Sequence, residues 1–299
     1  MYKNFAEILE AARGRGPLTV SVAVAQDQEV LIALKEAQAA GLIRPLLVGQ
    51  AAAIEPLARE AGLDGFEIID EPDQDQAALK AAEAVRQGRA QVLMKGLINS
   101  SNFLKAVLDK ERGLRKSKLL CHLGVFEVAG YERLMFMSDG GMNVAPDLAA
   151  KKEILLNALE ALKNMGLDQP NVAVMSHNEQ VNDKMPSTTD AAALAEMAAR
   201  GELPPCVLEG PMAMDVAASR QAAQHKKLDS RISGSVDFFL MPNIEAGNMV
   251  GKTLIYYARA AFAGLILGAV APVVLTSRSD TPAAKLNSIA LACLSADRG

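Results

Sequence analysis

Short apolar runs rich in β-branched residues alternate with longer amphipathic segments along almost the whole chain. The runs have the length of buried strands, and we expect strands over 19–25, 45–49, 66–70, 91–96, 119–128, 133–139, 171–176, 205–210, 236–242 and 272–277. Helical spacing of apolar positions predicts helices over 27–40, 74–87, 100–110, 147–165, 189–200, 213–225, 245–261 and 281–295. This alternation predicts an α/β fold of parallel β-α-β units, with helices on both faces of the sheet.

The number of expected strands bears on domain organisation, because a typical sheet has about five or six strands. Ten candidates favour two α/β lobes over one. The alternation breaks at LLCHLGVFEVAGYERLMFMSD, where two strand-like runs are separated only by AGYE around Gly130. This gap cannot hold a crossover helix, so we expect a hairpin or a lobe boundary there. No long flexible linker separates the lobes, which favours a ligand site in the cleft between them.

Composition excludes several functional classes. The 299 residues are 50% hydrophobic and 22% charged, with a net charge of −4, so no basic face for nucleic acid is expected. The most apolar segment, which starts at Ala260, is about 16 residues long and contains Gly and Pro, so it is too short for a membrane span. The amphipathic N-terminal segment does not resemble a secretory signal. We expect a soluble cytoplasmic protein without membrane partners.

Metal and disulfide chemistry is not indicated. The three cysteines are far apart in the sequence, and the histidines are isolated, at 122, 177 and 225. The fingerprints GxGxxG, GxxxxGK[ST], GxSxG and HExxH are absent. We therefore expect no metal site and look for chemistry where expected strands end, since parallel α/β sheets bind ligands beyond the carboxyl ends of their strands.

The polar cluster TSRSDTP follows the last apolar run. One interpretation is that Arg278 holds a phosphate or a developing oxyanion beside a helix N-terminus, with Ser277 next to it. The alternative is simple capping, in which Asp280 or Thr281 caps the helix that Pro282 begins and Arg278 is a surface charge. The pattern alone leaves both open.

The segment PNIEAGNMVGKTL follows another expected strand. Glu245 and Asn248 share a helical face, Lys252 lies one turn beyond Asn248, and Asn243 lies at the start of the helix. These side chains are candidates for binding a ligand. Alternatively, Asn243 only caps the helix and Glu245 complements its dipole.

Two further segments have the same position after a strand. In FMSDGGMNVAPD, two glycines lie between Asp139 and Asn143. This segment is either a loop that a small ligand can approach closely or simply a turn before a helix capped near Asp147. In LMKGLINSSNFLKAV, Ser100 and Ser101 lie where a helix begins, so free backbone N–H groups can bind an anion. A capped helix explains the serines equally well.

Together these segments resemble the phosphate acetyltransferase and phosphate butyryltransferase family, most strongly over about 134–291. DGGMNVAPD is similar to its Asp-x-x-x-Asn segment, VAVMSHNEQ to its Val-Ala-Met-Leu-Ser strand and turn, and EGPMAMDVAA to its Asp-Gly-x-x-x-x-Asp-Ala-Ala stretch. PNIEAGN is similar to its Pro-Asp/Asn-x-Glu-Ala-Gly-Asn signature, and VVLTSRSD to its Ser-Arg element. The EAGN and SR motifs at the right separation are a specific pair.

The resemblance implies a two-lobed, three-layer αβα fold with mostly parallel sheets and an inter-domain cleft, similar to isocitrate and isopropylmalate dehydrogenases. One discontinuous domain would comprise 1–128 and 264–299, and the inserted one 129–263. It also implies a homodimer or larger homo-oligomer. The implied reaction is reversible transfer of a short acyl group, butanoyl, between coenzyme A and inorganic phosphate, with coenzyme A as a substrate and neither a metal nor a tightly bound cofactor.

The resemblance also implies residue roles. Arg278 would bind phosphate and stabilise the oxyanion, and Ser277 would hydrogen-bond the thiol or the tetrahedral species. The substrate-binding residues would be Asp139, Asn143, Asn243, Glu245, Asn248, Lys252, Ser100, Ser101 and Lys105.

Three departures from the acetyl branch favour the butyryl branch. The catalytic aspartate of that branch corresponds to Ala284, so we expect Asp280 to be the base that deprotonates the thiol. An arginine of the acetyl branch corresponds to Lys105, and its cysteine after the Asp corresponds to Gly140, which we expect to leave room for a longer acyl chain.

Three alternatives remain. The first is the same reaction with acetyl-CoA, and the second is a non-catalytic module that binds acyl-CoA or acyl phosphate. The third is a pyridine-nucleotide dehydrogenase, although its metal-binding aspartates and nucleotide fingerprint are absent from the sequence.

Overall fold

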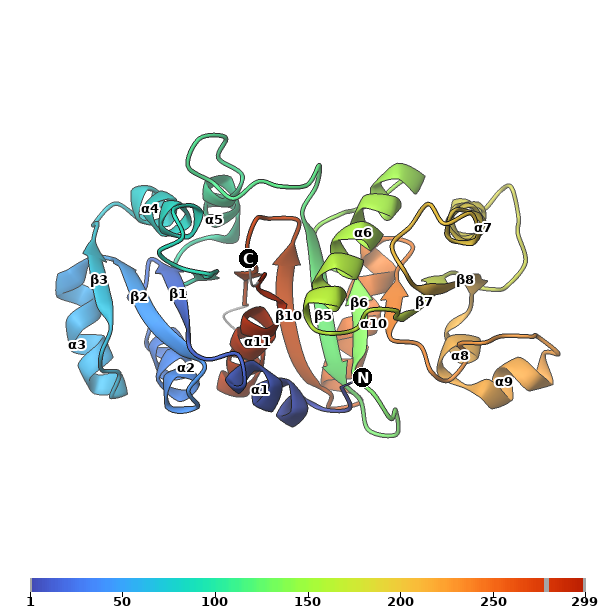
Figure 1. Cartoon of the computed structure of the whole chain (residues 1–299), viewed down its shortest axis with the longest axis horizontal. Helices are drawn as coiled ribbons and strands as arrows, with labels where there is room; N and C mark the ends of the chain where they lie inside the picture. Colours follow the sequence, from blue (N-terminus) through green and yellow to red (C-terminus); the bar gives the residue numbers. More distant parts are fainter. Residues whose placement is uncertain (1, 277–279, 298–299) are drawn as a thin grey trace. The chain divides into compact units, whose positions relative to one another are not determined.

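The computed structural model describes residues 2–276 and 280–297, so the predicted catalytic residues Ser277 and Arg278 lie outside the described residues. The chain forms two compact units. The terminal unit comprises Ala6–Ser117 and Ala263–Gly299, and the central unit comprises Met1–Phe5 and Lys118–Phe262. Each unit combines strands and helices, as the alternation of the sequence predicts (Figure 1).

The strands of the terminal unit follow the order β3-β2-β1-β4-β11-β10. Neighbouring strands pair in parallel, except that β10 and β11 are antiparallel. Parallel strands place their carboxyl ends at one edge, so the loops after β1, β4 and β11 lie near one another. The bounds are β1 (Leu18–Ala23), β2 (Ile43–Gly49), β3 (Glu67–Asp70), β4 (Val92–Lys95), β10 (Ala261–Leu267) and β11 (Val273–Val274).

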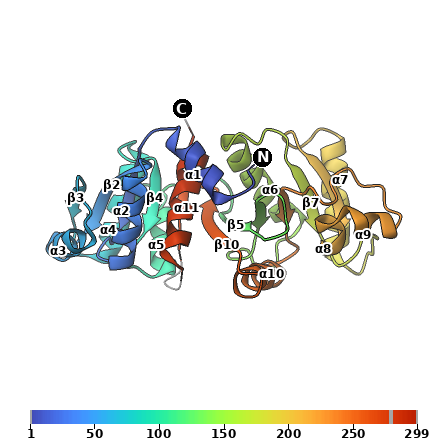
Figure 2. The same ribbon diagram turned by 90° about the horizontal axis from the view of Figure 1, so that it is seen from below.

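Helices cover this sheet on both faces, so its inner strands are mostly apolar and buried (Figures 1 and 2). Helix α2 packs against α3 and α11, and α4 packs against α5. Side chains cap several of these helices: Asp27 caps α2, Asp73 caps α4 and Thr281 caps α11. The bounds are α1 (Phe5–Arg13), α2 (Gln28–Ala39), α3 (Ala51–Ala61), α4 (Gln74–Arg86), α5 (Ser100–Val107) and α11 (Pro282–Ser295).

The central unit has the strand order β5-β6-β9-β7-β8. The strands β5 and β6 form an antiparallel pair across the short AGYE segment, which confirms the predicted hairpin, and the other pairs are parallel. The bounds are β5 (Cys121–Glu127), β6 (Met135–Ser138), β7 (Asn171–Met175), β8 (Val207–Met212) and β9 (Phe238–Leu240).

A buried cluster that includes Phe126, Met137 and Phe239 joins one face of this sheet to the helices α8, α9 and α10. Val250 and Leu254 of α10 pack against that cluster. The helices α6 and α7 contact each other, and α6 also contacts β5 while α7 contacts β7 and β8. The bounds are α6 (Leu148–Asn164), α7 (Pro186–Ala199), α8 (Met214–Ala218), α9 (Arg220–His225) and α10 (Ile244–Tyr256).

The elements differ from the predicted ones in a few places. The apolar segment after Ala260 is strand β10, not a helix end, and the helix expected over 245–261 ends at Tyr256. The helix expected over 213–225 is divided, because Ser219 adopts an extended conformation and caps α9. Helix α3 was not predicted from the sequence and contains Pro56. No helix among the described residues is long and apolar enough to cross a membrane.

Candidate functional site

The loop after β6 is organised by one buried carboxylate. Asp139 is 2% exposed. Its Oδ1 accepts hydrogen bonds from the backbone N–H groups of Gly141 (2.7 Å) and Met142 (2.9 Å). Its Oδ2 accepts from the N–H groups of His122 and Asn143 and from Nδ2 of Asn143, at 3.2, 3.3 and 2.6 Å. Five donors surround this carboxylate, so the geometry gives Asp139 the role of shaping the loop.

Asn143 completes the same network. Its Nδ2 donates both to Asp139 and to the carbonyl oxygen of Leu120, at 2.9 Å in the second case. The amide group thereby ties the end of the loop to the segment before β5. The predicted binding residues Asp139 and Asn143 are in direct contact, and a ligand would meet the loop backbone that they hold.

Helix α10 lies against this loop through glycine. A Cβ on Gly247 would lie 2.4 Å from the carbonyl oxygen of Asp139, and a Cβ on Gly140 would lie 2.8 Å from the carbonyl carbon of Gly247. The expectation that Gly140 leaves room for a longer acyl chain is therefore wrong. The backbone of α10 occupies that space, and Gly140 allows two backbones to approach closely.

The other predicted residues on α10 lie near its first turns. Asn243 caps the helix by accepting from the N–H of Ala246 at 2.9 Å, which is the capping role considered for it. The Nδ2 of Asn248 donates to the carbonyl oxygen of Gly140 at 3.1 Å. Glu245 and Lys252 are exposed, which leaves both side chains accessible to a ligand.

His122, which the sequence indicated only as an isolated histidine, lies beside the same loop. A Cβ on Gly141 would lie 3.1 Å from its Cγ, and its ring stacks with Phe262 at a centroid distance of 6.5 Å. Its spacing from Asp139 in the sequence gave no signal, because strand pairing brings the two together. Because side chains alternate between the two faces of a strand, the sequence of β5 could have indicated that the His122 side chain lies on the same face as Gly124 and Phe126.

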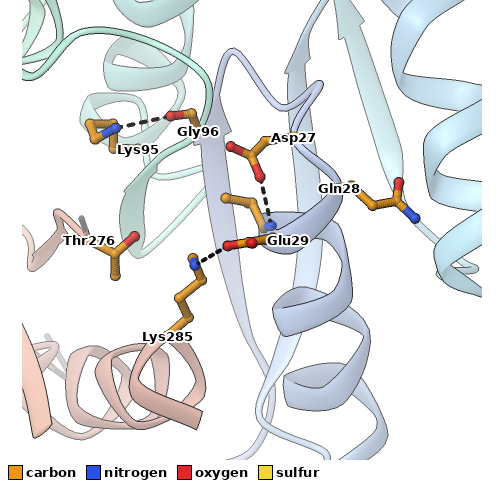
Figure 3. Close-up of a pocket in the computed structure, with 8 residues that line it drawn as sticks. Asp27, Gln28, Glu29, Lys95, Gly96, Thr276 and Lys285 are labelled. Atoms are coloured by element: carbon orange, nitrogen blue, oxygen red, sulfur yellow. Dashed lines mark hydrogen bonds and ion pairs between the residues drawn. The ribbon is translucent and has the colours of Figure 1, made fainter. Parts of the chain in front are cut away.

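A second candidate site lies in the terminal unit, in a pocket of about 280 Å³ at the carboxyl ends of β1 and β4 (Figure 3). The described residues that line it are Asp27, Gln28, Glu29, Val30, Lys95, Gly96, Thr276 and Lys285. Lys95 is buried, and its Nζ donates to the carbonyl oxygens of Gly96 and Ile98, both at 3.1 Å. Two buried ammonium groups and the start of α2 thus surround one small space.

The second ammonium group belongs to Lys285 of α11. Its Nζ donates to Oε2 of Glu29 at 2.8 Å and to the backbone carbonyl oxygen of Asp280 at 2.6 Å (Figure 3 shows the first contact). The hydrogen bond from Lys285 lowers the pKa of the Glu29 carboxyl, and the positive charge acts in the same direction. Neither Glu29 nor Lys285 was predicted from the sequence as a site residue. The available signal was that Lys285 is the only charged residue between Pro282 and Ser295.

The remaining predicted residues of this unit lie apart from that lining. Ser100, Ser101 and Lys105 are exposed on α5, and none of them is among the described residues around the pocket. The first residue before α5, Asn99, makes no side-chain capping hydrogen bond. Among 2–276 and 280–297, no group of three or more His, Cys, Asp or Glu side chains is placed to hold a metal ion.

Comparison with known proteins gives consistent matches. The phosphate acetyl/butaryl transferase family matches residues 65–293. The chain is 44% identical over 296 residues to the phosphate butyryltransferase of Clostridium acetobutylicum, covering 98% of each protein. It is 40% identical over 297 residues to the phosphate acetyltransferase of Rhizobium meliloti, covering 99% of this chain and 94% of that protein.

A solved structure shows the same fold. The branched-chain phosphotransacylase from Enterococcus faecalis superposes with a TM-score of 0.82 at 29% identity, covering 93% of this chain and 98% of that one. The α/β fold with mostly parallel strand pairing is therefore that of phosphotransacylases.

Proposed function

We propose, because the chain belongs to the phosphate acetyl/butaryl transferase family, that it transfers a short acyl group reversibly between coenzyme A and inorganic phosphate. The preferred group is butanoyl. The observation that carries this proposal is the 44% identity, over 98% of both proteins, to the phosphate butyryltransferase of Clostridium acetobutylicum. Coenzyme A is a substrate in this proposal, with no tightly bound cofactor.

In the forward direction, a phosphate oxygen attacks the thioester carbon of butanoyl-CoA. The carbon–oxygen bond forms, negative charge develops on the carbonyl oxygen, and the carbon–sulfur bond then breaks to release the thiolate, which takes up a proton. Arg278 binds the phosphate and stabilises the oxyanion, and Ser277 donates a hydrogen bond to it. In the reverse direction a base removes the thiol proton, and Asp280 is the proposed base.

The other residues bind the substrates in this proposal. The backbone of the loop held by Asp139 and Asn143, and the exposed groups of Glu245 and Lys252, are accessible in the central unit. In the terminal unit, the exposed start of α5 at Ser100 and Ser101, with Lys105, suits an anionic part of the substrate. Asn243 and Asn248 also bind substrate in this proposal, at the start of α10, where Asn243 caps the helix and Asn248 donates to the carbonyl oxygen of Gly140 in the loop.

The finer architecture is also part of the proposal. It comprises two domains of the isocitrate dehydrogenase type, in a homodimer or larger assembly located in the cytoplasm. The bounds that the resemblance implies are 1–128 with 264–299 and 129–263, whereas the compact units of the structure divide after Ser117 and after Phe262. Size-exclusion chromatography with light scattering measures the assembly. A strictly monomeric protein would contradict that part.

Thiol release from butanoyl-CoA, with and without phosphate, tests the reaction. We expect release to depend on phosphate and to fall by about 10²–10³-fold in Arg278→Ala, because a positioned donor to an oxyanion is worth that much. Arg278→Lys keeps the charge but loses the bidentate geometry, so it should lie between the two. An Arg278→Ala variant as active as the wild type would remove Arg278 from the site.

Acetyl-CoA is the second candidate substrate, and the 40% identity to a phosphate acetyltransferase favours considering it. Comparing kcat/KM for acetyl-, propanoyl- and butanoyl-CoA separates the two. One methylene group in an apolar pocket is worth about 10- to 200-fold. We expect a maximum at butanoyl-CoA, and a maximum at acetyl-CoA would assign the chain to the other substrate.

A further inference from the structure

Lys285 is a buried cation in an otherwise uncharged helix. The residue is 2% exposed, and it is the only charged residue between Pro282 and Ser295. Burying an ammonium group costs several kcal/mol unless partners compensate it. Its ammonium group donates hydrogen bonds to Oε2 of Glu29 on α2 and to the carbonyl oxygen of Asp280.

Stability gives no reason to keep a lysine at this position. Well-packed apolar residues often replace a buried ion pair without loss of stability, and α11 carries no other charged residue. The ion pair is also unequal: the side chain of Lys285 is 3% exposed, whereas that of Glu29 is 58% exposed. Solvent screens the Glu29 side of the pair, so its net contribution to folding is small.

The second partner of Lys285 has a particular place in the chain. Asp280 follows the predicted catalytic residues Ser277 and Arg278, and Thr276, which precedes them, lines the pocket with Lys285 and is buried. The hydrogen bond from Lys285 to the Asp280 carbonyl, at 2.6 Å, therefore holds the main chain at Asp280. The next residue, Thr281, is held by its own side chain, whose hydroxyl oxygen accepts a hydrogen bond from the N–H of Ala284.

We propose that Lys285 is a positioning residue for the segment that contains the predicted catalytic residues Ser277, Arg278 and Asp280. In this proposal Glu29 holds the Lys285 ammonium group at the pocket, in the orientation that binds the Asp280 carbonyl. The catalytic part of this inference rests on the proposed acyl transfer. Lys285 does not take part in the bond changes. Its contribution is to keep the backbone at Asp280 in the place that the reaction requires.

Four variants test this inference. Lys285→Met keeps the length of the side chain and removes the donor, Lys285→Arg restores a cationic donor, and Glu29→Gln keeps an acceptor without the charge. Lys80→Met is the matched control, because Lys80 forms an ion pair of similar length with Glu71 in the same unit, at 2.7 Å. The assay measures kcat and KM for butanoyl-CoA and phosphate, with the melting temperature of each variant.

We expect Lys285→Met to lower kcat by about 100-fold, as small misplacements of catalytic groups do, with KM for butanoyl-CoA changed less than about threefold. Lys285→Arg should recover at least about tenfold of that loss, and Lys80→Met should match the wild type. Glu29→Gln should lower kcat severalfold without a change in melting temperature. Wild-type kcat in Lys285→Met, or no recovery in Lys285→Arg, would overturn the inference.

Hydrogen exchange separates this inference from the proposed function, because it requires no turnover. Lys285→Met should accelerate amide exchange in the peptide covering 276–284, and Lys80→Met should leave it unchanged. If Lys285→Met fails to fold, Glu29→Gln gives the same measurement, since its carboxylate is largely exposed. Unchanged exchange in the folded variants would refute the positioning role, whereas a wild type without phosphate-dependent thiol release would refute the proposed function alone.

Discussion

The Asp139 carboxylate offers the sharpest test of how the loop after β6 is built. In Asp139→Asn, one oxygen becomes an NH₂ group that cannot accept a hydrogen bond. If the remaining oxygen takes the place of Oδ2, the N–H groups of Gly141 and Met142 lose their acceptor. If it takes the place of Oδ1, three donors from His122 and Asn143 lose theirs.

The less costly arrangement leaves two donors without an acceptor. Each unsatisfied, partly buried donor costs about 1–3 kcal/mol, so Asp139→Asn should lower the free energy of unfolding by about 2–6 kcal/mol. Urea unfolding measures this loss. The matched control is Asp147→Asn, because Asp147 only caps α6 and asparagine caps a helix about as well as aspartate. A loss in Asp139→Asn no larger than that in Asp147→Asn would refute the assignment of Asp139 as the organiser of the loop.

Four further predictions concern close packing, titration, thiol reactivity and the pH dependence of stability. Gly247→Ala should move α10 away from the loop and lower kcat/KM by about 100-fold. Gly251→Ala should lower kcat/KM far less, because its Cβ would contact only side chains, at 3.2 Å or more. Equal effects of the two substitutions would contradict the close approach of the α10 backbone to the loop. Carbon-detected NMR titration should show the pKa of Glu29 rising in Lys285→Met, because the hydrogen bond that lowers it is lost, and an unchanged pKa would count against that contact. Burial raises the pKa of the Cys121 and Cys293 thiols to about 12, so iodoacetamide should modify half-buried Cys206 first in the native protein, which mass spectrometry detects. The stability that these two thiols contribute is fully present below pH 9.0, the ordinary pKa of a thiol, and is lost as the pH rises toward 12. The reason is that the unfolded chain binds fewer protons than the folded chain in this range. A free energy of unfolding that rises between pH 9.0 and 12 would contradict the burial of the two thiols.

The sequence predicted most strands because buried strands are continuous apolar runs with clear ends. Strand β10 was missed because its sequence, AFAGLIL, consists of small and apolar residues that suit a helix or a strand equally. Strand β11 is short, since only Val273 and Val274 pair with neighbours. Helix α3 was missed because a proline inside a segment, here Pro56, usually predicts the end of a helix. Gly62, which ends the helix in the left-handed conformation, was the available signal for it.

The candidate site was only partly predictable. Asp139, Asn143 and Asn243 follow strands and carry capping chemistry that local sequence reveals. Contacts between distant segments had no such signal. Neither the pairing of Glu29 with Lys285, which are 256 residues apart, nor the approach of Gly247 to Asp139 follows from spacing. Both depend on how strand ends meet in the folded sheet.

The central claim is acyl transfer to phosphate, and the most direct measurement follows both products of one reaction. Butanoyl-CoA and phosphate are incubated with the protein, butanoyl phosphate is quantified by phosphorus NMR, and free thiol is quantified in the same sample. We expect equal amounts of acyl phosphate and free coenzyme A, with neither formed when phosphate is omitted. Thiol released without acyl phosphate would mean transfer to water and would contradict the proposed acyl transfer to phosphate.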